Sequence, residues 1–147
     1  MSDNFQIRSP STEQEWKDYD AFRWEILRKP LKLSHIPLKD ELEDVSLHLM
    51  GIDNKNNIIS CGRLHLNNSL EAQIRYMGVS SNHRRTGIGS AMVLELESKA
   101  LLQGVKKVVL NARAEAIKFY ESLGYSEIGP YESDIEIPRS SMKKNLI

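Results

Sequence analysis

The stretch that decides the fold is residues 80–100, SSNHRRTGIGSAMVLELESKA. Two arginines and two glycines stand in its hexapeptide RRTGIG, at 84–89, and a long apolar run follows. This order predicts a turn that leads into a buried helix over about residues 87–103, which Gly104 closes. The first N–H groups of a helix lack intrahelical partners and lie at the positive end of its dipole. The turn is therefore a candidate anion-binding site.

The sequence of this turn does not match either of two common nucleotide-binding loops. A Walker loop requires Gly-Lys-Ser/Thr at the start of the helix, but no lysine precedes Ser90 in GIGSAM. The dinucleotide pattern G-x-G-x-x-G requires a glycine where this chain has Met92. The bare G-x-G leaves two interpretations open. The glycines only shape a tight turn, or their missing Cβ atoms let phosphate oxygens approach the backbone.

Composition restricts the class of protein. The 147 residues predict one domain over residues 1–147. Twenty basic and 20 acidic residues give a formal net charge of zero, so we expect neither nucleic acid nor a membrane as a partner. Cys61 is the only cysteine, which excludes an internal disulfide and predicts no metal cluster. The N-terminus does not resemble a signal peptide, and a cytoplasmic protein is expected.

Helix signals in the N-terminal part follow a short strand signal. The helix is predicted to end before Pro30. Its capping box is either Ser11 with Gln14 or Thr12 with Glu15, and the sequence leaves both open.

The order of the elements predicts the fold class. Strands are predicted at residues 5–8, 45–53, 58–66, 72–80, 105–112, 125–133 and 139–147. Residues 31–44 are irregular, with a short helix expected around 39–43, and a second short helix is expected at 114–124. Antiparallel neighbours in the first half and a strand–helix–strand crossover in the second predict an α/β (mixed α+β) fold. Its mixed, mostly antiparallel sheet has about seven strands flanked by helices.

Two side-chain placements follow from periodicity. In residues 58–66, alternation predicts Cys61, Arg63 and His65 on one face of the sheet, with Gly62 and Leu64 on the other. In the helix at 87–103, apolar residues occur almost all round, which predicts a well-buried helix with Glu97 as its clearest solvent position.

Two motifs together resemble the GNAT superfamily of acyl-CoA-dependent N-acyltransferases. RRTGIG is similar to its Q/R-x-x-G-x-G/A turn and follows a strand ending in YMGV. Further along, AIKFYESLGY at 116–125 is similar to its A-x-x-F-Y-x-x-x-G-F/Y segment. FRWEILRKPL and DELEDVSLHL resemble a small, mostly uncharacterised subgroup. The resemblance implies the superfamily's fold, in which two neighbouring strands splay apart at the cofactor.

The resemblance also implies an activity. The chain would be an N-acetyltransferase that moves an acetyl or short acyl group from CoA to a primary amine, directly, in a ternary complex. Acetyl-CoA is the implied cosubstrate, and the acceptor is a small-molecule amine or a protein amine. A non-catalytic acyl-CoA-binding sensor or interaction module on the same fold is the alternative. Dimers are common in the family, so a homodimer is left open.

Cofactor contacts come from the turn and the segments beside it. In the family, backbone N–H groups of the turn hold the pyrophosphate and the splayed strand pairs with the pantetheine arm. The predicted cofactor-binding residues are Met77, Gly78, Val79, Arg84, Arg85, Thr86, Gly87, Ile88, Gly89, Ser90, Asn111, Phe119 and Tyr120. Core packing for Met77 and Val79, and a capping role for Asn111, are the alternatives.

Acyl transfer needs a proton for the leaving thiolate, donors for the oxyanion and a neutral amine. The resemblance makes Tyr120 the general acid, because a phenol stays protonated at neutral pH, and makes the Val79 backbone N–H the oxyanion donor. Ordinary packing is the alternative for Tyr120. His65 and Glu71 are the candidates for the base, and a structural role is the alternative for His65.

One position departs from the subgroup's pattern. The subgroup tends to show Ile-Pro-His near the C-terminus, whereas this chain reads IPRSSM and has Arg139. No role is therefore carried over to this position. One interpretation of the arginine is an acceptor that bears a carboxylate.

Overall fold

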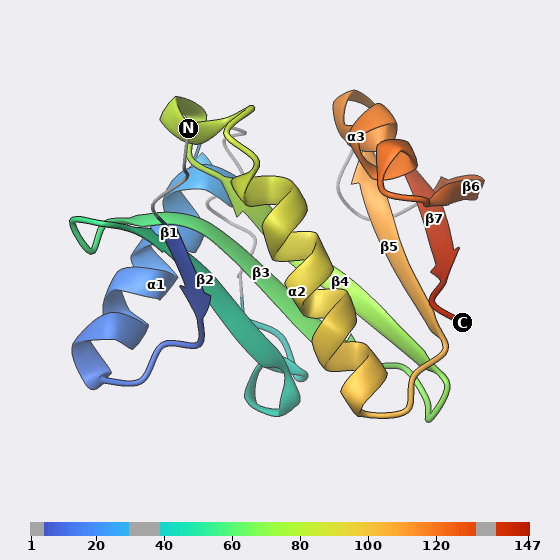
Figure 1. Ribbon diagram of the computed structural model, residues 1–147, viewed down its shortest axis with the longest axis horizontal. Helices are drawn as coiled ribbons and strands as arrows, with labels where there is room; N and C mark the ends of the chain where they lie inside the picture. The colour runs from blue at the N-terminus through green and yellow to red at the C-terminus, as the bar shows by residue number, and fades with distance from the viewer. Residues whose placement is uncertain (1–4, 30–38, 132–137) are drawn as a thin grey trace.

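The computed structural model describes residues 5–29, 39–131 and 138–147 (Figure 1). Within them, seven strands form one sheet in the spatial order β1-β2-β3-β4-β5-β7-β6. The strands are β1 (Phe5–Arg8), β2 (Leu47–Asp53), β3 (Ile58–Leu66), β4 (Glu71–Val79), β5 (Lys107–Arg113), β6 (Ser126–Tyr131) and β7 (Arg139–Asn145). The helices are α1 (Glu13–Leu27), α2 (Ile88–Leu102) and α3 (Ile117–Ser122), with short 3-10 helices η2 (Glu43–Val45), η3 (Ser81–His83) and η4 (Ala114–Ala116). The predicted mixed fold is confirmed.

The β4–β5 pair is the parallel one and is the point where the sheet opens. Register pairs exist only between Glu71 and Lys107, Ala72 and Val108, and Gln73 and Val109. Beyond them the two strands diverge toward the end where α2 begins and α3 lies (Figure 1). The other strand pairs of the sheet are antiparallel. The splayed strand pair implied by the family resemblance is therefore present.

Helices cover both faces of the central strands. A Cβ on Gly62 would lie 2.9 Å from Leu96 of α2, so this face of β3 packs against α2. Cys61 belongs to the buried cluster that contains Tyr19 and Leu27 of α1, on the opposite face. The alternation predicted for this strand is confirmed, and both of its faces are buried.

The start of α1 selects one of the two predicted capping boxes. The Thr12 hydroxyl accepts the Glu15 N–H at 3.0 Å, and the Glu15 carboxylate accepts the Ser11 N–H at 2.9 Å. Thr12 is thus the N-cap and Glu15 its partner, with the Glu15 carboxylate bound to the N–H of Ser11 rather than to that of Thr12. Pro30, predicted to end this helix, and residues 31–38 lie outside the described residues.

The short helix expected around residues 39–43 was predicted too early in the chain. The structure has a 3-10 turn at Glu43–Val45 instead. The Asp40 carboxylate accepts the Leu42 N–H at 3.0 Å, which holds this part of the chain in an Asx turn. The helical turn therefore starts only after this turn is complete.

The prediction that Glu97 faces solvent was wrong, although α2 is well buried as expected. The Glu97 side chain is 8% exposed. It accepts a hydrogen bond of 2.8 Å from the Tyr125 hydroxyl and pairs with Lys144 of β7 at 2.9 Å. Both partners come from later segments that pack beside the helix. Leu94, at 49% exposed, is one of the positions of α2 that faces solvent instead.

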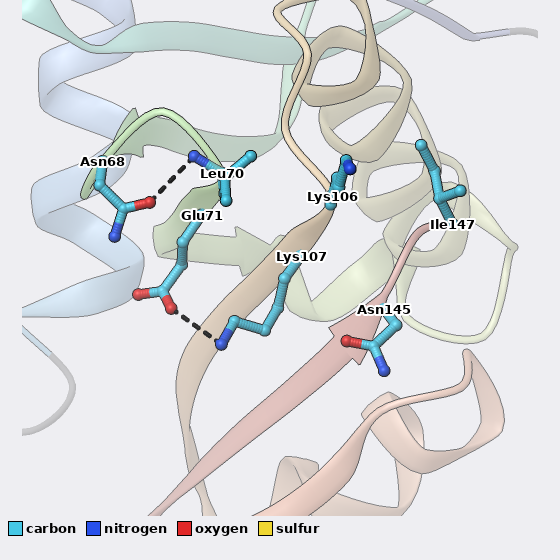
Figure 2. Close-up of a pocket in the computed structure, with 7 residues that line it drawn as sticks. All are labelled: Asn68, Leu70, Glu71, Lys106, Lys107, Asn145 and Ile147. Carbon is cyan, nitrogen blue, oxygen red and sulfur yellow. Dashed lines mark hydrogen bonds and ion pairs between the residues drawn. The ribbon is translucent and has the colours of Figure 1, made fainter.

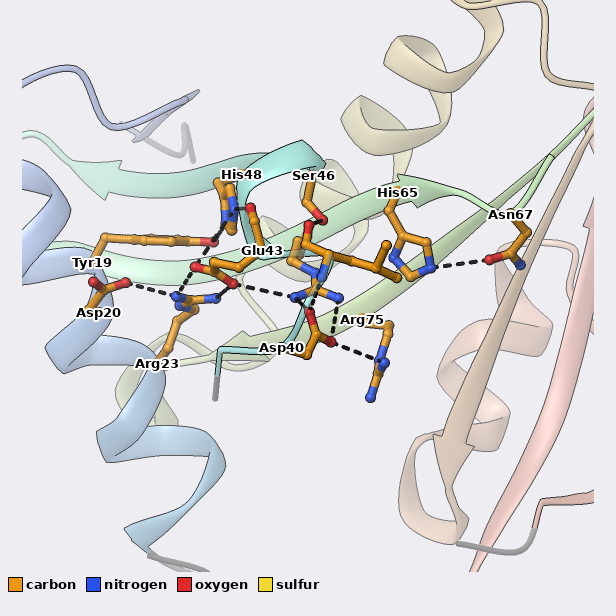
Figure 3. Close-up of polar contacts among 12 residues, drawn as sticks. Tyr19, Asp20, Arg23, Asp40, Glu43, Ser46, His48, His65, Asn67 and Arg75 are labelled. Atoms are coloured by element: carbon orange, nitrogen blue, oxygen red, sulfur yellow. Dashed lines mark hydrogen bonds and ion pairs between the residues drawn. The ribbon is translucent and has the colours of Figure 1, made fainter. Parts of the chain in front are cut away.

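A buried ionic network joins α1 to β3 through the segment before β2 (Figure 3). Arg23 of α1 and Arg63 of β3 have fully buried side chains. Arg23 pairs with Glu43 at 2.6 Å, and Arg63 pairs with Asp40 at 2.9 Å. Burial raises the pKa of both carboxyl groups, but hydrogen bonds from the arginines, helped by the Leu42 N–H at Asp40, outweigh it and lower each pKa. The network therefore holds two carboxylates ionised.

Of the described helices, none is both long and apolar enough to cross a bilayer.

Candidate active site

The turn before α2 presents a set of backbone N–H groups. Arg85 and Gly87 both adopt left-handed φ angles, +67° and +93°, and the Thr86 hydroxyl donates to the His83 carbonyl at 2.6 Å. The N–H groups of residues 87–90 donate no hydrogen bond to any other described residue. Since these groups sit at the N-terminus of a 15-residue helix, they form a candidate anion site. The side chains of Arg84 and Arg85 are exposed at the same turn.

A β-bulge shapes β4 where it leaves β5. Cys61 lies opposite Gly78 and Arg63 opposite Arg75, so two residues of β4 face one residue of β3. One of the two is Tyr76, whose φ of +54° is left-handed. The bulge turns the last residues of β4 relative to the first ones.

The backbone of Val79 faces the gap between β4 and β5. Ser80 N donates to Ile59 O at 2.8 Å, and Ser60 lies opposite Val79 in the ladder. Since hydrogen-bonded and non-hydrogen-bonded pairs alternate in an antiparallel ladder, the N–H of Val79 points away from β3. On its other side β5 has already diverged, so this N–H is free to contact a ligand.

Gly78 has a structural reason to be glycine. A Cβ at this position would lie 2.5 Å from Ile26 Cδ1 of α1 and 3.3 Å from Leu27 Cδ2. Helix α1 therefore packs closely against Gly78 and holds the splayed end of β4 on the face of the sheet opposite α2.

Three of the predicted site residues come together beside the turn. A Cβ added to Gly89 would lie 3.4 Å from both Val79 Cγ2 and Phe119 Cζ. The start of α2, the end of β4 and helix α3 thus meet at one point. Ile88, by contrast, is fully buried and packs over Gly51, so its side chain anchors the turn while its N–H stays in the anion site.

Tyr120 differs from the other buried tyrosines in its hydroxyl. Its side chain is 8% exposed and its ring packs edge-on against Phe119 and Tyr125. Tyr125 donates to Glu97, and Tyr19 is 2.8 Å from a nitrogen of His48. Among the described residues, the Tyr120 hydroxyl has no hydrogen-bond partner. Burial raises the pKa of Tyr120, and the charge of Arg113 opposes this shift only in part.

Asn111 lies on β5 opposite Ser141 of β7. Its Oδ1 accepts the Ser141 hydroxyl at 2.8 Å, while its amide nitrogen has no hydrogen bond to another described residue. The alternative role for Asn111, a cap at a turn or helix, does not occur, because β5 continues past this residue to Arg113. The amide nitrogen is therefore available to a ligand.

Glu71 and His65 lie at the paired end of the sheet, not at the splayed end. Glu71 stands opposite Lys107 and pairs with it at 3.2 Å beside a shallow surface cavity (Figure 2). His65 stands opposite Gln73, and its Nε2 is 3.1 Å from Asn67 Oδ1. At about 3.3 Å per residue, Gln73 lies roughly 20 Å along β4 from Val79. The structure therefore does not bring either candidate base to Val79.

The pKa values of His65 and Glu71 are both lowered, which leaves the histidine neutral and the glutamate charged. Burial, with the nearby charge of Arg63, lowers the pKa of His65 and keeps its ring neutral. The hydrogen bond from Asn67, followed by the Lys107 ammonium, lowers the pKa of Glu71 and keeps it ionised.

Sequence reasoning missed a group of aromatic and basic side chains on the other face of the splay. Tyr76 is ringed by arginines, with Arg28 and Arg75 at 5.4 and 5.1 Å from its ring centroid. Arg113 of β5 lies directly opposite Arg139 of β7. Of these four arginines, the sequence pattern drew attention only to Arg139. Gly78 in the segment AQIRYMGV is compatible with a bulge, which the structure has at the two residues before it, but the alternation does not predict how the bulge orients Tyr76.

Comparisons with known proteins agree with this geometry. The model of the Acetyltransferase (GNAT) family matches residues 3–125. The chain is 28% identical to the uncharacterized N-acetyltransferase YjcF of Bacillus subtilis (strain 168) over 134 residues, which cover 90% of this chain and 94% of that protein. The crystal structure of an acyl-CoA N-acyltransferase from Pseudomonas aeruginosa shares the fold, with a TM-score of 0.79, 22% identity and coverage of 97% and 99% of the two chains. An aminoglycoside 6'-N-acetyltransferase complexed with coenzyme A gives a TM-score of 0.75 at 14% identity, over 97% of each chain.

The splayed sheet, the turn and these similarities define the class of protein as an acyltransferase that uses acyl-CoA. Within that class, the chain belongs to the Acetyltransferase (GNAT) family.

Proposed function

We propose that this protein transfers an acetyl or short acyl group from CoA to a primary amine, by direct attack of the amine in a ternary complex. The observation that carries the proposal is the meeting of Val79, Gly89 and Phe119 beside the four unpaired N–H groups of residues 87–90. A pyrophosphate needs such donors, and a thioester lying in the splay would then reach the free N–H of Val79.

The turn is the part of the site that fits coenzyme A best. Residues 87–90 supply backbone donors to the pyrophosphate, and the exposed guanidinium groups of Arg84 and Arg85 supply charge. The glycine at 89 matters because a longer side chain would start from a position already in contact with Val79 and Phe119, next to the N–H groups proposed to hold the pyrophosphate. Met77, Gly78 and the Asn111 amide nitrogen are the proposed partners of the pantetheine arm.

Tyr120 is proposed as the general acid. Its hydroxyl has no partner among the described residues, and burial keeps it protonated. A protonated phenol beside the thioester would donate its proton to the CoA thiolate as the tetrahedral intermediate collapses. The attacking nitrogen then gives up its extra proton, which restores the phenol directly or through water. The Val79 N–H would hold the oxyanion of that intermediate.

Direct transfer is favoured over an acyl-enzyme because the single thiol is a poor nucleophile. Cys61 is fully buried, and burial raises the pKa of its thiol to about 12. Its Sγ also donates to the Tyr76 carbonyl at 3.3 Å. A thiol with these properties is almost entirely protonated at neutral pH.

For the base, His65 and Glu71 are still the candidates from sequence, and a relay of water molecules along β4 would have to connect either of them to the amine. We propose the simpler route, in which the acceptor amine loses its proton to solvent before it enters the splay. In this route the fraction of neutral amine, rather than a protein group, sets the dependence of the rate on pH.

Calorimetry with acetyl-CoA, followed by measurement of CoA thiol release over a panel of primary amines, tests the proposal. We expect binding and release with at least one class of amine. The absence of binding would overturn the whole proposal. Binding without release for every amine would favour the alternative, a non-catalytic acyl-CoA sensor on the same fold.

A further inference from the structure

Four arginine side chains gather around the splay, beside the bulge of β4. Arg28 and Arg75 lie 5.4 and 5.1 Å from the centroid of the Tyr76 ring. Arg113 and Arg139 occupy directly opposed positions on β5 and β7. Like charges at opposed positions of neighbouring strands destabilise a sheet. Their presence here therefore calls for a physical reason.

The four guanidinium groups lie within electrostatic range of one another. Burial lowers the pKa of Arg28 and of Arg139, and the charges of Arg75 and Arg113 lower both further. Arg28 and Arg139 also make contacts of their own. The mutual repulsion is nevertheless a property of the whole group, and an anion between these side chains would relieve it.

Among the described residues, the acids near Arg75 and Arg113 do not match the charge of these two arginines. Asp40 holds Arg63 with two hydrogen bonds of 2.9 and 3.0 Å and reaches Arg75 only at 3.3 Å (Figure 3). Glu115 approaches Arg113 at 3.8 Å and is 73% exposed, so this pair is weak. Arg75 and Arg113 thus keep donors that a ligand could use, with side chains 37% and 33% exposed.

The arginine group is also close to the proposed chemistry. The charge of Arg113 lowers the pKa of the Tyr120 hydroxyl, although burial outweighs it, so the two side chains lie in the same region. Asn111, two residues earlier on the same face of β5, is a proposed partner of the cofactor arm. A ligand held by Arg113 and Arg139 would therefore reach the region where the thioester is expected.

We propose that these arginines bind an anionic group of the acceptor, so that the preferred acceptor is a primary amine that carries a carboxylate or a phosphate. The inference rests on the proposed acyl transfer and names its substrate class. Guanidinium groups match both anions with paired hydrogen bonds, and the planar fork makes arginine better suited to this than lysine.

A matched set of amines tests the inference. The probes are propylamine, 1,3-diaminopropane, 3-aminopropanoate and 2-aminoethyl phosphate, whose far ends are neutral, cationic, carboxylate and phosphate. With acetyl-CoA saturating, we expect kcat/KM for one or both anionic probes to exceed that for propylamine by on the order of 10–100-fold, with 1,3-diaminopropane the poorest. Comparison of kcat/KM for 3-aminopropanoate and 2-aminoethyl phosphate shows whether a carboxylate or a phosphate is preferred.

Variants connect the preference to the arginines. Arg139→Gln should remove most of the preference for the anionic probe while leaving propylamine within about threefold of the wild type. Arg113→Gln should also remove most of the preference. Arg139→Lys should keep only part of it, because lysine retains the charge without the fork. Lys143→Gln is the matched control, since Lys143 is an exposed cation on the same strand at the far side from the splay. It should change nothing.

The outcomes separate this inference from the proposed function. Equal or better transfer to propylamine and 1,3-diaminopropane would overturn the inference and leave the acyltransferase in place. If no amine is acylated, calorimetry of the CoA-bound protein with each probe decides. Binding of an anionic probe that Arg139→Gln abolishes supports the arginine site, and binding of none overturns it.

Discussion

Val79 at the end of β4 packs against Gly89 in the first turn of α2, with 3.4 Å between Val79 Cγ2 and the position of a Cβ on Gly89. The contact joins the two ends of the proposed acyl-CoA site. The residue proposed to hold the oxyanion is fixed against the turn proposed to hold the pyrophosphate. A change at Gly89 should therefore affect binding first.

Replacing Gly89 by Asp should weaken acetyl-CoA binding by on the order of 100-fold, because a carboxylate would lie in an anion site. Gly89→Asn has nearly the same size without the charge and should lose much less. Gly89→Ala adds only a Cβ in ordinary contact and should fold and bind. Calorimetry on the three variants measures this order. Equal affinities for the Asp and Asn variants would argue against a pyrophosphate at the turn.

Tyr120→Phe should reduce kcat by about 100-fold while the Kd for acetyl-CoA changes little, because the phenol acts on the leaving thiolate. Since burial raises the pKa of Tyr120, the wild-type rate should show no decline from its ionisation up to about pH 10. Tyr125→Phe is the matched control. It removes a buried hydroxyl bound to Glu97, so it should lower Tm and spare kcat. A Tyr120→Phe enzyme with full activity would exclude the general acid.

The sequence predicted the fold well because its signals were local. The turn at 84–89, the helix after it and the strand alternation are set by residues close in the chain, and the structure has them within a residue or two. Glu97 could not be predicted in this way. Its partners Tyr125 and Lys144 lie 28 and 47 residues away, and only the packed fold brings them to α2.

The geometry of the turn before α2 could be predicted from the sequence, and that of the arginine group could not. Spacing within RRTGIG fixes which N–H groups the helix leaves unpaired. By contrast, the arginine group depends on the left-handed φ of Tyr76 and on the register that sets Arg113 opposite Arg139. Both are properties of strand pairing. No local pattern in the sequence specifies them.

Glu43→Gln should lower the free energy of unfolding by about 3 kcal/mol, because it leaves the buried Arg23 with the half-exposed Asp20 as its remaining carboxylate partner among the described residues. The pKa values of Glu43 and Asp40 in the folded protein lie below the ordinary values of 4.5 and 3.8 for these groups. Their contribution is therefore complete above these values and is lost as the pH falls toward the folded-state values. Denaturant titrations between pH 3 and 7 should show a shallower acid decline in Glu43→Gln. The exposed Glu121→Gln should match the wild type.

Cys61→Ala should keep acyl transfer, since direct attack requires no thiol on the protein. Initial-rate plots should intersect for wild type and variant alike, as a ternary complex requires. Mass spectrometry after incubation with acetyl-CoA should find no acyl adduct on Cys61. Parallel lines, or loss of turnover in a variant that still folds and binds acetyl-CoA, would indicate an acyl-enzyme instead.

His65→Gln and Glu71→Gln should each change kcat/KM by no more than about threefold, because both groups lie at the paired end of β4, roughly 20 Å or more from Val79. The pH dependence of kcat/KM provides a second test of whether a protein group acts as the base. If solvent removes the proton, the rise of kcat/KM should follow the pKa of the amine and shift when an amine of lower pKa is used. A protein base would hold the midpoint fixed across amines. A fixed midpoint that moves only in His65→Gln would make His65 the base through a water relay, since burial already lowers its pKa and keeps the ring neutral.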